Sequence, residues 1–138
     1  MGTRRKAREW ALQLLYQYEL TQGSVAHISE TFWEEQQTDQ ETRHFAEELI
    51  AGVRAQLEKV DAIIGEYSAH WKVHRMAAVD KNVLRLGVYE LMFRQDIPTR
   101  VTLNEAVEIA KRFGTEESGA FVNGILDQVA KRAAQHKA

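Results

Sequence analysis

Residues 79–98 read VDKNVLRLGVYELMFRQDIP, and their apolar side chains repeat at intervals of three and four. This period is that of an α-helix and not of a strand. Apolar positions cover so much of the circumference that we expect this helix, from Met76 to about Arg94, to be buried on several sides. Pro98 follows its end, where a helix cannot continue. The segment therefore predicts a central helix with other helices packed around it.

The same period recurs on both sides of this segment, and Pro98 is the only proline in the chain. We expect further helices at Thr3 to Leu20, at Ser29 to Gln36, from Asp39 through Val60, from a cap at Asp61 to Tyr67, from Thr102 to Phe113, and from about Phe121 onward. The fold class predicted is all-α, with about seven helices.

A capping box is predicted at Thr102-Leu103-Asn104-Glu105. In this motif the threonine side chain accepts from the amide of Glu105, and the glutamate reaches back to the amide of Thr102. Gly114 suits the end of the same helix, because glycine tolerates a left-handed turn.

The composition is that of an ordinary globular chain, with 138 residues, 44% hydrophobic and 28% charged. This size predicts one domain, residues 1–138, with residues 131–138 as a flexible basic tail. The absence of cysteine excludes disulfides and thiolate sites. The sequence shows neither a signal peptide nor an apolar run of eighteen residues, so a cytoplasmic location is expected and a membrane is not.

Enzyme signatures are not found in the sequence. The eight glycines are scattered and form no phosphate-binding loop. His70 and His74 have the spacing of a metal-ligand pair on a helix, but no third ligand follows at a recognisable spacing. We therefore expect no catalytic activity, no cofactor and no metal.

Basic residues crowd the start of the first helix, at Arg4, Arg5, Lys6 and Arg8, although the net charge is only −2. Cations are unfavourable in a first helical turn, by about 0.3–1 kcal/mol each, so a compensating anion such as phosphate is one interpretation. A solvated, frayed terminus is the other.

A second candidate site follows the polar residues 115–118, where Phe121 lies near a helix N-terminus. An aromatic side chain there can stack on an unpaired base, for about 1–3 kcal/mol. Taken alone, Phe121 is better explained as a core residue than as an RNA contact. Tyr16 and Tyr18 have the same ambiguity, since at least one faces inward.

Three segments together resemble the NusB family. They are RRKAREWALQLLYQYEL (4–20), VDKNVLRLGVYELMFRQDIP (79–98) and VTLNEAVEIAKRFGTEESGAFVNGILDQVAK (101–131), and the last two are the most specific. The resemblance covers nearly the whole chain and is loose only over 23–61 and 68–76.

The resemblance implies a fold of two roughly perpendicular three-helix bundles with an additional helix. It also implies a bacterial factor that binds the single-stranded boxA element of ribosomal RNA leader transcripts together with NusE, a small-subunit ribosomal protein. That complex supports transcription antitermination by RNA polymerase with other Nus factors, and rRNA maturation.

The same resemblance implies roles for individual residues. Those expected to contact RNA are Arg4, Arg5, Lys6, Arg8, Tyr16, Glu117, Phe121 and Asn123, and those expected to face NusE are Tyr67, Asp80 and Leu84. Gly119 and Ala120 depart from family members with a basic side chain there, which predicts a weaker grip on RNA by this loop.

Two alternatives stay open on the sequence. Some rRNA methyltransferases carry a NusB-like helical domain, but this chain ends where their catalytic domain would begin. An all-helical protein-protein adaptor or homodimer without specific RNA binding is the other.

Overall fold

The computed structural model describes residues 2–21, 23–68 and 71–137, and all regular structure within these ranges is helical. The elements are α1 (Gly2–Leu20), α2 (Val25–Glu35), α3 (Gln40–Ala55), α4 (Leu57–Tyr67), a 3-10 turn η1 (Val73–Arg75), α5 (Ala78–Phe93), α6 (Thr99–Phe113) and α7 (Ser118–Lys137). The predicted all-α class is confirmed.

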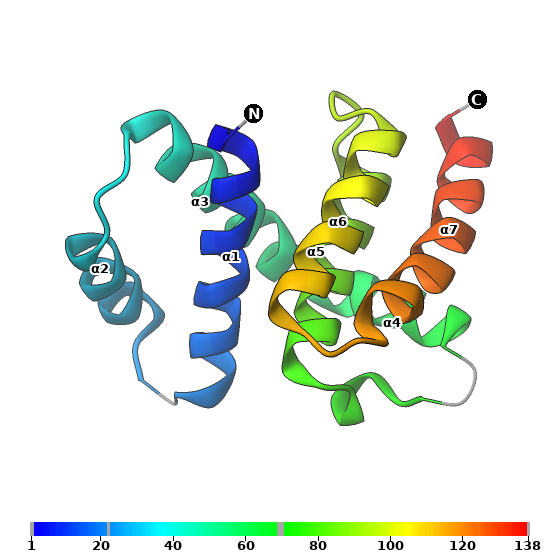
Figure 1. Cartoon of the computed structure of the whole chain (residues 1–138), viewed down its shortest axis with the longest axis horizontal. Helices are drawn as coiled ribbons and strands as arrows, with labels where there is room; N and C mark the ends of the chain where they lie inside the picture. Colours follow the sequence, from blue (N-terminus) through cyan, green and yellow to red (C-terminus); the bar gives the residue numbers. More distant parts are fainter. Residues whose placement is uncertain (1, 22, 69–70, 138) are drawn as a thin grey trace.

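The helices form two groups that lie side by side (Figure 1). In one group α1 packs against α3 and, less extensively, against α2. In the other, α5, α6 and α7 pack against one another, and α4 is the additional helix that contacts α5 and α7. Contacts of α5 with both α1 and α3 join the two groups.

Helix α5 is the centre of the core, as its apolar circumference predicted. Val83, Leu84, Val88 and Leu91 are all at most 2% exposed. The helix contacts α1, α3, α4, α6 and α7, so almost every face of it is covered. Burial on all sides explains why its hydrophobic pattern has no clear polar stripe.

The predicted boundary at Asp61 is wrong. Asp39 does cap α3, since its side chain accepts a hydrogen bond from the amide of Thr42 at 2.7 Å. That helix ends at Ala55, however, and α4 already begins at Leu57. Asp61 therefore lies inside α4, where it pairs with Arg85 instead of capping a helix.

The predicted capping box is also wrong. Helix α6 begins at Thr99, directly after Pro98, so Thr102 lies one turn inside it. The hydroxyl of Thr102 donates to Glu90 at 2.8 Å, and Glu105 accepts from Arg5. Both side chains have tertiary partners, which outweigh the local cap.

The C-terminal segment, predicted to be a flexible basic tail, is helical as far as the structure describes it. Helix α7 continues to Lys137, and its apolar face continues through Val129 and Ala130 to Ala133, which is 2% exposed. Packing of this face holds the helix against the core as far as Ala133.

Candidate functional site

The predicted basic cluster at the start of α1 divides into exposed and buried side chains. Arg4 and Lys6 are exposed. The guanidinium of Arg4 lies 4.5 Å from the centroid of the Phe45 ring, and the ammonium of Lys6 lies 4.3 Å from that of Trp10. Both cations rest on aromatic rings and present their charge to solvent.

Arg5 is engaged by a carboxylate from α6. Its Nε and Nη2 donate to the two oxygens of Glu105 at 2.8 and 2.6 Å, while its side chain stays 42% exposed. These hydrogen bonds lower the pKa of Glu105 and raise that of Arg5. A phosphate reaching Arg5 has to compete with Glu105.

Arg8 does not fit its predicted role in contacting phosphate. Its side chain is 4% exposed and donates to both carboxylate oxygens of Glu90, at 2.9 and 2.8 Å. Thr102 donates to the same carboxylate, so three helices meet at one buried hydrogen-bonded group. With both Nε and Nη2 donating to Glu90 and the side chain 4% exposed, Arg8 is not accessible to an RNA phosphate.

A second ion pair between α1 and α6 adds a cation that the sequence analysis did not single out. Arg112, 63% exposed, donates to Glu9 at 2.9 Å. Lys6 lies 3.7 Å from the same carboxylate. Only the fold reveals this cation as a neighbour of the cluster, because Glu9 and Arg112 are 103 residues apart.

Phe121 and Glu117 line a cavity of about 230 Å³ together with Asp80. The other lining residues are Trp71, Arg75, Met76, Ala77 and Thr115. Residues predicted to contact RNA and a residue predicted to face NusE thus share one cavity. Trp71 is 58% exposed, and Asp80 Oδ1 is buried without a hydrogen-bond partner among the described residues, so both are candidates for ligand contact.

Asn123 is not in that cavity. It is two positions after Phe121, and side chains at this spacing point away from each other on a helix. Asn123 instead lines a groove between α6 and α7 with Asn104 and Lys111. Tyr16, 40% exposed on α1, lines neither of these two sites. The predicted RNA contacts therefore lie on more than one surface.

Two residues predicted to face NusE differ in accessibility. Leu84 is 0% exposed in the core, which contradicts a role in docking. Its position on α5 is inward because α5 is surrounded. Tyr67, at the end of α4, is half-buried and packs against the core. It keeps some surface for a partner.

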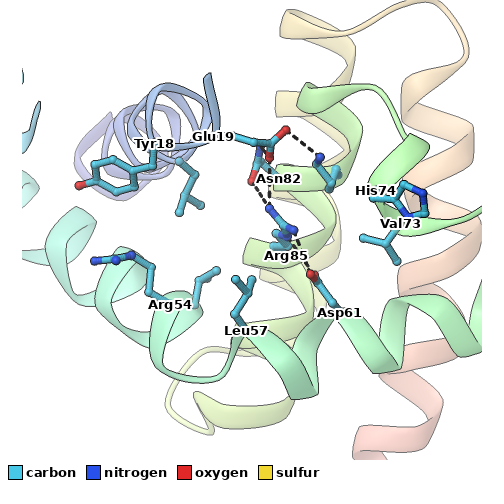
Figure 2. Close-up of a pocket in the computed structure, with 12 residues that line it drawn as sticks. Tyr18, Glu19, Arg54, Leu57, Asp61, Val73, His74, Asn82 and Arg85 are labelled. Atoms are coloured by element: carbon cyan, nitrogen blue, oxygen red, sulfur yellow. Dashed lines mark hydrogen bonds and ion pairs between the residues drawn. The ribbon is translucent and has the colours of Figure 1, made fainter. Parts of the chain in front are cut away.

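A network of charged side chains from α1, α4 and α5 lines a cavity of about 480 Å³ (Figure 2). Glu19 accepts from Lys81 at 2.7 Å and from Arg85 at 3.3 Å, and Arg85 also pairs with Asp61 at 2.9 Å. Tyr18, which the sequence offered beside Tyr16 as a candidate RNA contact, is half-buried and lines this cavity. These charges pair with each other and hold the three helices together.

No group of three potential metal ligands occurs among the described residues. His70, one of the two histidines considered as ligands, lies outside those residues. The described helices also include none that is long and apolar enough to span a membrane.

Comparison with known sequences identifies relatives over nearly the full length. The profile of the NusB family matches residues 5–131. The transcription antitermination protein NusB of Sorangium cellulosum is 50% identical over 131 residues, which cover 95% of this chain and 94% of the relative. The protein of the same name from Myxococcus xanthus is 48% identical over 134 residues, 94% of this chain and 96% of the relative.

Solved structures agree with the sequence relatives. T. maritima NusB superimposes with a TM-score of 0.86 at 41% identity, covering 97% of this chain and 95% of that one. A chain from a crystal structure of the antitermination factors NusB and NusE with double-stranded RNA gives 0.85 at 28% identity, with coverages of 96% and 98%. The helical arrangement of the described residues, the family profile and these relatives together place the chain in the NusB family.

Proposed function

We propose that this protein is a cytoplasmic transcription antitermination factor that binds single-stranded boxA RNA of rRNA leader transcripts together with NusE. It acts as a scaffold in the antitermination complex of RNA polymerase with other Nus factors and catalyses no reaction. Membership of the NusB family supports this proposal, as does the relative that was crystallised with NusE and RNA.

The exposed cations at the start of α1 are the main structural support for the proposed RNA binding. Arg4 and Lys6 are exposed, and Arg5 is partly so. Arg112 lies beside them through its ion pair with Glu9. Arginine binds phosphate through a planar fork, and neutralising phosphates releases counterions, which supplies affinity without sequence preference.

The proposed binding site for NusE is the cavity lined by Asp80, Glu117 and Phe121. The buried Asp80 Oδ1 has no partner within the described residues, and such an atom costs free energy until a donor reaches it. Phe121 at the border of the same cavity is then placed to stack on a base. RNA and NusE would meet at this border, and each would strengthen the binding of the other.

Fluorescence anisotropy of a labelled boxA-type RNA tests the proposal. A scrambled single strand and a duplex serve as controls, each with and without NusE, over a range of salt. We expect preferential binding to boxA that NusE strengthens, with a log-log salt slope of roughly −2 for about three neutralised phosphates. Equally weak binding to all three RNAs with NusE present would refute RNA recognition. If NusE still bound to the protein, a protein-protein adaptor without specific RNA binding would be the better description of its function.

A further inference from the structure

A shallow groove of about 640 Å³ lies between α6 and α7. Its lining residues are Asn104, Val107, Glu108, Lys111, Gly119, Ala120 and Asn123. Lys111 and Glu108 form an exposed pair at 3.6 Å, so the charges of the lining cancel. The polar groups that remain are two primary amides.

The amides of Asn104 and Asn123 are exposed, one on each helix beside the groove. Neither side chain hydrogen bonds to another group in the part of the chain that the structure describes. A primary amide presents a donor and an acceptor side by side, which matches the edge of a nucleobase such as adenine. Proteins read single-stranded RNA through such contacts to unpaired bases.

Small residues keep the groove open. A Cβ atom on Gly119 would lie 3.0 Å from Lys111 Cγ, so the stem of Lys111 lies directly over this glycine. Ala120 adds only a methyl group. The ammonium of Lys111, whose side chain is 63% exposed, reaches solvent and can exchange its exposed partner Glu108 for a phosphate.

The groove adjoins the basic end of α1 through α6. Asn104 immediately precedes Glu105, which holds Arg5, and Lys111 immediately precedes Arg112, which holds Glu9. One face of α6 thus carries the ion pairs to α1, and the neighbouring face lines the groove. An RNA held at the start of α1 needs only to cross α6 to reach the groove.

We propose that this groove binds an unpaired base of the same RNA, with Asn104 and Asn123 contacting the base edge and Lys111 the adjoining phosphate. The inference rests on the proposed RNA binding and extends it to a surface separate from the Phe121 cavity. A neutral groove lined by amides suits a base, whereas the cations on α1 suit the backbone.

Anisotropy with NusE and the boxA-type RNA tests this site through Asn104→Ala, Asn123→Ala and the groove-filling Ala120→Leu. Each replaces an exposed helical residue, so the fold is retained, which circular dichroism checks. We expect each variant to lose about fivefold or more in affinity, while the salt slope stays that of the wild type, because no charge is removed. Gln135→Ala, an exposed amide on α7 outside the groove, should bind like the wild type.

Arg5→Gln provides the contrast, since loss of a phosphate contact reduces the salt slope by about one. If the wild type binds boxA RNA and Arg5→Gln weakens it, but all three groove variants bind normally, the groove is not part of the RNA site. Loss of NusE binding by the groove variants in the absence of RNA would also overturn the inference, because a protein would then occupy the groove. Failure of the wild type to bind any RNA would instead refute the proposed function.

Discussion

The guanidinium of Arg5 on α1 donates to both carboxylate oxygens of Glu105 on α6, at 2.8 and 2.6 Å. The pair joins the basic end of α1 to the second helix group. It also means that a carboxylate already occupies the position where an RNA phosphate would bind Arg5.

Removal of this carboxylate charge should strengthen RNA binding. In Glu105→Gln the fork of Arg5 no longer pairs with an anion, so a phosphate binds without displacing one. We expect affinity for boxA-type RNA with NusE to rise several-fold at low salt, and the gain to shrink as salt screens the contact. Glu58→Gln, an exposed carboxylate on α4, removes the same charge elsewhere and controls for net charge. A gain of equal size in both variants would exclude a local effect of Glu105.

The same pair should make stability depend on pH. Hydrogen bonding from Arg5 lowers the pKa of Glu105 below its ordinary value of 4.5. A lowered pKa contributes stability that is fully present above 4.5 and is lost as pH falls through the folded value. Urea denaturation should therefore show wild type more stable than Glu105→Gln at pH 6, with the difference diminished at pH 3. A difference that grows at pH 3 would contradict the assignment.

Asp96 should titrate at unusually low pH. Arg94 donates to both of its oxygens at 2.9 Å and lowers the pKa of Asp96 to about 2. NMR titration of the Asp96 side-chain carboxyl should therefore give a midpoint near 2. In Arg94→Gln the midpoint should move up toward 3.8, the ordinary value. An unchanged midpoint in this variant would show that Arg94 is not the cause.

Arg8 should be essential for stability. Arg8→Met leaves Glu90 buried and without its cation, which costs about 3–5 kcal/mol in the free energy of unfolding. Lys6→Gln, two residues earlier but exposed, should change it by less than about 0.5 kcal/mol. Urea denaturation compares the two. The double variant Arg8→Met with Glu90→Leu should recover much of the loss, because no unpaired charge remains; absence of recovery would point to packing instead.

Two helical glycines should respond in opposite directions to alanine. At Gly52 on α3 a Cβ atom would lie 2.0 Å from the Tyr89 ring, so Gly52→Ala should destabilise by about 1–3 kcal/mol. At Gly65 on α4 nothing lies within 4 Å, so Gly65→Ala should stabilise by about 0.5–1 kcal/mol through helix propensity. Thermal unfolding measures both. A stabilising Gly52→Ala would show that Tyr89 moves aside without cost.

Periodicity was sufficient to predict the helices, since it depends on neighbours in the sequence. The circumference of α5 predicted its burial, and Asp39 was correctly predicted to lie at a helix start. The wrong boundaries at Asp61 and Thr102 arose where a side chain has a distant partner that competes with the local motif. Such partners leave no trace in local spacing.

The candidate site was harder to predict for the same reason. A run of four cations predicts a charged surface. Arg8 is nevertheless absent from that surface, because it is buried in an ion pair with Glu90, 82 residues away. Glu105, 100 residues away, engages Arg5, and Arg112 joins the cluster from α6. Trp71 carried no motif that could have indicated its cavity.

The buried contact of Arg8 with Glu90 and Thr102 has a consequence for the energetics of recognition. A helix that begins with cations opposes its own macrodipole and would ordinarily unwind at that end. Here α1 is fastened to α5 and α6 within its first turns. Arg4 and Lys6 are thus presented on an ordered backbone before any ligand arrives, and little backbone entropy is left to lose when a phosphate binds.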